Sequence, residues 1–144
     1  MKRNLSDLLR DNEVKAVKPD EEQAKDCIAV AERDLKASLA NLKMGEFDWA
    51  FAVAYNAMIQ ATRALMLAEG YAPVGEAHHK AVVDYAWMKL GASAEGEAEF
   101  FEHARKKRHH VVYDKAGTVT RREAEEALTH ATKLVAAIKN KLKR

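Results

Sequence analysis

The chain of 144 residues has one cysteine, two prolines, six glycines and no long apolar run. The single cysteine, Cys27, excludes an internal disulfide framework and a cysteine-based zinc site. Its apolar neighbours favour a small buried side chain over a reactive thiol. No apolar run approaches the ~20 residues that span a bilayer, and the first residues lack the apolar region of a secretory signal. We therefore expect a cytoplasmic protein with no membrane partner.

The composition indicates a helical globular domain. Hydrophobic residues make up 48% of the chain and charged residues 32%, which is not the balance of a disordered segment. A chain of this length can bury one core. The net charge is only +2, so any affinity for nucleic acid must come from local clustering of cations.

Apolar residues recur at spacings of three and four in five segments, which predicts five helices. The predicted helices cover residues 19–44, 46–69, 76–90, a segment that follows a Ser93 cap, and 120–142. The second is apolar over so much of its circumference that we expect it at the centre of the fold. Thr120 followed by Glu123 predicts a capping box for the last helix. We find no strand-like alternation and no internal repeat.

The predicted fold class is all-α, an antiparallel four- or five-helix up-and-down bundle over residues 19–144. Residues 1–18 are expected to form an N-terminal extension. This extension either adds a short helix near "LSDLL" or stays mobile.

Several candidate sites lack the residues that their chemistry needs. His78 and His79 are adjacent, but the positions one helical turn further on are Val82 and Val83, which cannot ligate a metal. We interpret the pair as histidines of a helix start or loop. Arg63 either reaches the surface or faces a cleft. The sequence has no HExxH, no paired ExxH, no Walker loop and no GxSxG elbow. We expect no metal and no cofactor.

The basic run "RKKRHHVVYD" at residues 105–114 admits two interpretations. It is either a cationic helix end favoured by the helix dipole or a catalytic arginine–histidine pair. On an α-helix His109 lies about 40° round the axis from Arg105, and His110 about 140°. His110 therefore joins Arg105 only if the helix ends or distorts there, or if a second chain supplies the partner.

A family resemblance bears on this choice. Ala54, Tyr55, Ala57 and Met58 lead to Leu65 and to Glu69-Gly70-Tyr71, and Arg105 is followed by His110 with four residues between. These patterns resemble the HEPN domain superfamily over most of residues 21–142. The resemblance implies a helical bundle that dimerises through its helices. It also implies a metal-independent endoribonuclease site between two protomers, and in many members a toxin paired with a minimal nucleotidyltransferase antitoxin.

Carried onto this chain, the resemblance implies that Arg105 and His110 are the catalytic pair. Histidine has the near-neutral pKa of a general base, and arginine forks onto phosphate oxygens. Further residues of the run are expected to bind RNA or nucleotide phosphate: Lys106, Lys107, Arg108, His109 and, by stacking or packing, Tyr113. Two alternatives stay open: a non-catalytic HEPN module that binds nucleotide or RNA with a nucleotidyltransferase partner, and a purely structural bundle.

Overall fold

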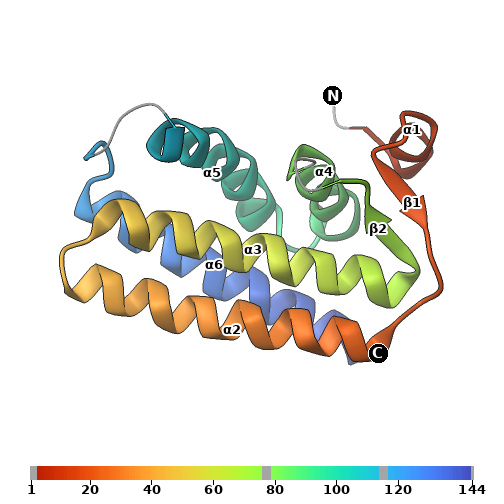
Figure 1. The fold of residues 1–144 in the computed structure, drawn as a ribbon, viewed down its shortest axis with the longest axis horizontal. Helices are drawn as coiled ribbons and strands as arrows, with labels where there is room; N and C mark the ends of the chain where they lie inside the picture. Colours follow the sequence, from red (N-terminus) through yellow and green to blue (C-terminus); the bar gives the residue numbers. More distant parts are fainter. Residues whose placement is uncertain (1–2, 76–78, 114–116, 144) are drawn as a thin grey trace.

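The computed structural model describes residues 3–75, 79–113 and 117–143, and for residues 110–113 it describes the backbone alone. The helices are α1 (Leu5–Arg10), α2 (Glu21–Lys43), α3 (Phe47–Glu69), α4 (His79–Leu90), α5 (Glu95–Tyr113) and α6 (Arg121–Leu142), and the strands are β1 (Val14–Ala16) and β2 (Tyr71–Pro73) (Figure 1). The predicted all-α helical bundle is confirmed.

Helix α3 lies at the centre of the bundle, as its apolar circumference predicts. Thirteen of its residues are buried, and it contacts α2, α4, α5 and α6. Figure 1 shows α2, α3 and α6 running along the long axis, with α4 and α5 on one side of them. Because α3 has neighbours on several sides, it positions the two helices that carry the basic run and His79.

Gly70 ends α3 in the left-handed conformation, with φ of 92°. A Cβ atom at this position would lie 3.1 Å from the carbonyl oxygen of Val17 and 3.2 Å from the Pro19 ring. Both the backbone angle and the close approach of the N-terminal segment therefore require glycine here.

The prediction that the chain has no strand is wrong. β1 and β2 form a two-stranded antiparallel sheet in which Val14 pairs with Pro73 and Ala16 with Tyr71. Each strand has three residues, too few for an alternating pattern to show in sequence. The pairing joins segments that are distant in the chain, so only the packed structure brings them together.

The N-terminal segment takes the helical form that the sequence left open. Asn4 and Asp7 form a capping box at the start of α1, and Leu8 and Val14 are buried in the main core. Arg3 bonds the buried carboxylate of Asp84 on α4 with an Nε–Oδ2 distance of 3.1 Å. Residues 3–16 are thereby held against α4.

Two predicted helix starts have different outcomes. The Thr120 capping box is confirmed, because the Glu123 amide donates to Thr120 Oγ1 at 3.1 Å and the Thr120 amide donates to Glu123 Oε1 at 2.9 Å. The Ser93 cap is wrong. Helix α5 begins at Glu95, and the Ser93 hydroxyl donates to the Leu90 carbonyl at 3.5 Å.

The link between α5 and α6 is held by a carboxylate of α3. Asp48 accepts hydrogen bonds from the backbone amides of Gly117 at 2.5 Å and Val119 at 3.2 Å.

We expect Asp48→Ala to lower the free energy of unfolding by about 1–2 kcal/mol, because both amides lose a charged acceptor. Denaturant unfolding measures this. An unchanged midpoint would show that water replaces the carboxylate without cost.

Candidate phosphate-binding site

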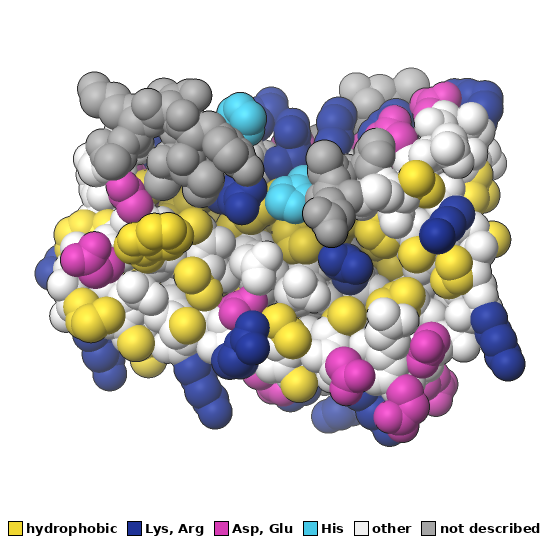
Figure 2. Space-filling view, in the orientation of Figure 1, with side chains coloured by type: hydrophobic (Ala, Val, Ile, Leu, Met, Phe, Trp, Pro, Cys, Tyr) yellow, Lys and Arg dark blue, Asp and Glu magenta, His cyan; other side chains and the backbone are white. Residues whose placement is uncertain are grey.

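The basic run lies on the last turns of α5, which stays helical through Tyr113. Arg105 and Arg108 are half-buried, whereas Lys106 and His109 are exposed. Figure 2 shows histidine side chains among lysine and arginine side chains on the upper part of this face of the molecule, above a belt of hydrophobic side chains. The cations of the run therefore divide between a buried and an exposed side of one helix.

Arg105 is oriented by a carboxylate one turn earlier in α5. Its Nη2 lies 3.0 Å from Oε1 of Glu102, and 26% of its side chain is exposed. Its Nε atom is buried and has no hydrogen-bond partner among the described residues. Lys106 also approaches Glu102, with 3.9 Å between Nζ and Oε1. Glu102 thus compensates part of the positive charge of this turn.

Lys107 turns away from Arg105 and towards α6. Its Nζ donates to the Thr118 carbonyl at 3.3 Å and lies 3.5 Å from Oε2 of Glu123. The pKa of Glu123 is lowered, chiefly by the backbone hydrogen bond from Thr120 and further by Lys107. In this arrangement Lys107 fastens α5 to the start of α6.

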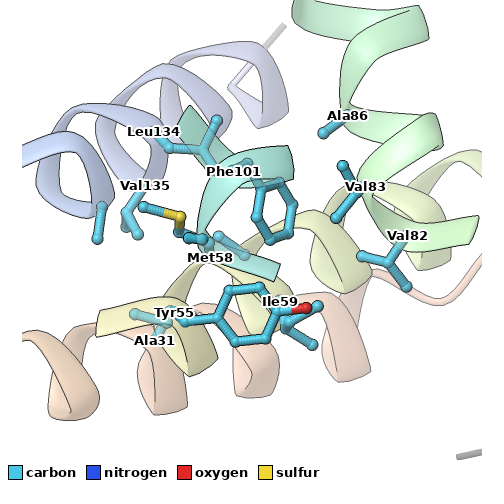
Figure 3. Packing of buried hydrophobic residues seen from close by; sticks show 14 of the residues in the cluster. Ala31, Tyr55, Met58, Ile59, Val82, Val83, Ala86, Phe101, Leu134 and Val135 are labelled. Atoms are coloured by element: carbon cyan, nitrogen blue, oxygen red, sulfur yellow. The ribbon is translucent and has the colours of Figure 1, made fainter. Parts of the chain in front are cut away.

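Arg108 lies over an aromatic ring of α3. Its Cζ atom is 5.8 Å from the ring centre of Tyr55, within the range of a cation–π interaction. Phe101 of α5 also packs on this ring, with 5.7 Å between ring centres (Figure 3). Tyr55 is 1% exposed, and burial raises the pKa of its hydroxyl.

His79, the first residue of α4, packs on the same ring. The centres of the His79 and Tyr55 rings are 5.6 Å apart, and His79 is half-buried. Burial lowers its pKa below the ordinary 6.5, and the nearby positive charges of Arg108, Arg105 and Arg63 lower it further. The fold therefore brings His79 and Arg108 onto the Tyr55 ring, where α3, α4 and α5 meet, and places Arg105 close enough to lower the pKa of His79.

The interpretation of His79 as a histidine of a helix start is confirmed, but its packing on Tyr55 close to the arginines of α5 was not predicted from the sequence. His79 and Arg105 are far apart in the chain and lie on different helices. Only information on which residues of these two predicted helices contact each other could have revealed that His79 lies near Arg105. The side chains of His110 and Tyr113, and the whole of His78, lie outside the described residues.

Arg63 takes the cleft-facing alternative. It lines a hollow of about 330 Å³ together with two lysines, Lys15 and Lys18, and with Asp20. Its Nε atom is buried and has no hydrogen-bond partner within the described part of the chain. Cys27, predicted to be buried, is only partly buried. Burial raises the pKa of its thiol, and the charge of Arg63 partly offsets this.

Metal-ligand clusters and membrane-spanning helices are both absent from the described parts of residues 3–75, 79–113 and 117–143. In these ranges no three His, Cys, Asp or Glu side chains are grouped to hold a metal ion. None of the helices there combines the length and the apolar character needed to cross a bilayer.

Comparisons with known proteins define the class. The family model of the HEPN domain matches residues 24–141, so this chain belongs to the HEPN family. The resemblance stated from Ala54, Tyr55 and the arginine–histidine spacing is thereby confirmed. No curated protein sequence matches the chain at a significant level.

Two solved structures are similar over most of their length. TT1696 from Thermus thermophilus is 26% identical, with a TM-score of 0.64, and the match covers 83% of this chain and 98% of that one. ST0689, described as an archaeal HEPN homologue, is 20% identical with a TM-score of 0.66 and the same coverage of the two chains. The second likeness shows the shared fold alone.

The lowered pKa of His79 makes stability depend on pH. In the unfolded chain His79 takes up a proton near pH 6.5, whereas in the folded chain it resists protonation until lower pH. The unfolded state therefore binds more protons in this window, and the contribution of His79 to stability is lost as the pH falls below about 6.5. We expect His79→Gln to flatten the loss of unfolding free energy in this range.

Urea unfolding of both proteins at a series of pH values provides the measurement. A wild type and a variant that lose stability in parallel below pH 6.5 would contradict the electrostatic account. An NMR titration of His79 tests the same point directly.

Proposed function

We propose that this HEPN protein is a metal-independent endoribonuclease that holds the scissile phosphate between Arg105 and Arg108. The observation that carries the proposal is the arrangement around Tyr55. Arg108 of α5 and the imidazole of His79 both lie against the Tyr55 ring. Arg105, half-buried one turn earlier on α5, is close enough to His79 for its positive charge to lower the pKa of the imidazole. Partly desolvated guanidinium groups bind phosphate oxygens strongly, and the fork of arginine matches them in geometry.

Cleavage without a metal needs an internal nucleophile. The ribose 2′-hydroxyl loses its proton and attacks the adjacent phosphorus, and the bond to the 5′-oxygen breaks. The products are a 2′,3′-cyclic phosphate end and a 5′-hydroxyl end. The arginines stabilise the charge that builds on the phosphoryl oxygens, and imidazole groups transfer the protons near neutral pH.

The helical register of α5 bears on the assembly. Because α5 continues through Tyr113, position 110 lies about 140° round the axis from position 105. We therefore place His110 of one protomer opposite Arg105 of a second in a homodimer. Two copies of the run facing each other would form a cationic groove suited to RNA.

The proposed biological role is the toxin of a toxin–antitoxin pair, with a nucleotidyltransferase as antitoxin. The alternative is a non-catalytic module that binds RNA or nucleotide phosphate beside such a partner. The contacts of Glu102 favour this alternative, because its carboxylate already pairs with the guanidinium of Arg105 and approaches Lys106. The cleavage assay below separates the two functions.

We expect Arg105→Lys and His110→Ala each to lower RNA cleavage by about 10²–10⁴-fold. Lysine keeps the charge but loses the planar fork, and a proton-transfer group contributes a factor of this size. His109→Ala should cost far less. Cleavage of a labelled RNA should survive EDTA and leave a 2′,3′-cyclic phosphate. A wild type that binds RNA without cleaving it would establish the non-catalytic alternative.

Adjacent lysines offer a matched pair for RNA binding. Lys106 is 71% exposed, whereas Lys107 is 21% exposed and bonded to α6. Lys106→Ala should weaken RNA binding and reduce the slope of log affinity against log salt by about 0.7, the loss of one phosphate contact. Lys107→Ala should instead lower the free energy of unfolding by about 0.2–1 kcal/mol.

Salt-dependent fluorescence anisotropy and denaturant unfolding measure the two effects. The reverse pattern, with Lys107 dominating the salt slope, would show that the contacts of Lys107 with α6 give way to RNA.

A further inference from the structure

We propose that His79 is the general base of the cleavage step and acts in the same protomer as Arg105 and Arg108. The assignment rests on the proposed ribonuclease function and names its proton acceptor. It adds an imidazole from α4 to a site that sequence spacing places wholly on α5.

Packing brings His79 and Arg108 onto one aromatic ring within one chain. The His79 ring and the Arg108 guanidinium lie 5.6 Å and 5.8 Å from the centre of the same Tyr55 ring. Tyr55 is buried, so it acts as a fixed support from which the imidazole and the guanidinium are both positioned. His79 itself is half-buried, which leaves part of its ring accessible to a substrate.

The charges around His79 suit a base. Arg105 and Arg108 on α5 and Arg63 on α3 are close enough for their charges to lower the pKa of His79, and Glu102 is hydrogen-bonded to Arg105. Partial burial first, and these arginines second, lower the pKa of His79, which favours the neutral imidazole, the form that accepts a proton. When an RNA phosphate binds between the arginines, its negative charge offsets theirs and strengthens the base as the reaction proceeds.

The step balances without a metal or any redox partner. A ring nitrogen of His79 takes the proton of the 2′-hydroxyl while the 2′-oxygen forms its bond to phosphorus. The bond from phosphorus to the 5′-oxygen breaks, and that oxygen takes a proton from a second acid, for which His110 is the proposed source. His79 then returns its proton to solvent.

The first experiment compares His79→Ala with His103→Ala in the full chain. His103 is an exposed histidine of α5 that packs beside Phe100 and has no part in the proposed site, so its variant should cleave like the wild type. On a labelled oligoribonucleotide, kcat of His79→Ala should fall by about 10²–10⁴-fold. Binding of the same RNA with 2′-deoxy sugars should change little, and added imidazole should restore part of the cleavage by His79→Ala.

Imidazole rescue distinguishes the loss of a catalytic base from the loss of folding, because added imidazole cannot restore cleavage by a misfolded protein. The variant His79→Gln, which keeps a polar side chain of similar reach, serves where alanine lowers the melting temperature, and it should be equally inactive. If the wild type and His79→Ala cleave RNA equally well, His79 is not the general base, and the proposed ribonuclease function is unaffected. A wild type that cleaves no RNA overturns both.

Mixed dimers test whether His79 and Arg105 act in one chain. In a two-fold dimer with shared sites, mixing Arg105→Ala with His79→Ala chains leaves every site with one defect, so no activity should return. Mixing Arg105→Ala with His110→Ala chains should restore activity, because one site of the mixed dimer is intact. Restoration in the first mixture would overturn the placement of His79 in the same protomer.

Discussion

Burial of α3 on several sides is the constraint on which the rest of this structure depends. A helix so apolar gains stability only when neighbours cover most of its surface, and α2, α4, α5 and α6 all contact it. Tyr55 lies within this buried surface at 1% exposure. Because α4 and α5 must both pack against α3, the first residue of α4 and Arg108 of α5 meet at the Tyr55 ring. The site is thus a consequence of core packing.

Gathering cations at the edge of a core is electrostatically unfavourable, and two contacts and one lowered pKa offset this. Glu102 pairs with Arg105, the Tyr55 ring lies under Arg108, and the lowered pKa of His79 disfavours a further positive charge there. What remains is a pair of arginines that are oriented but incompletely neutralised. A phosphate group complements such a pair, and this is the physical basis of the proposed function.

The basic run is not one functional unit. Lys107 fastens α5 to α6 through Thr118 and Glu123, Lys106 is exposed to solvent, and the two arginines lie half-buried. Residues adjacent in sequence project from different sides of a helix. A cluster of cations in sequence therefore divides into side chains that join helices and side chains that stay exposed, according to which neighbours each side of the helix meets.

Helices α2 to α6, the central place of α3 and the capping box at Thr120 could be predicted from the sequence, because periodicity, burial pattern and caps are local properties. The family also followed from local patterns, through the residues around Tyr55 and the spacing of Arg105 and His110. Tertiary structure alone decided the pairing of Val14 with Pro73, the turn of Lys107 towards α6 and the meeting of His79 with the arginines. Each of these joins residues from separate segments of the chain, and such contacts arise only when the helices close around a shared core.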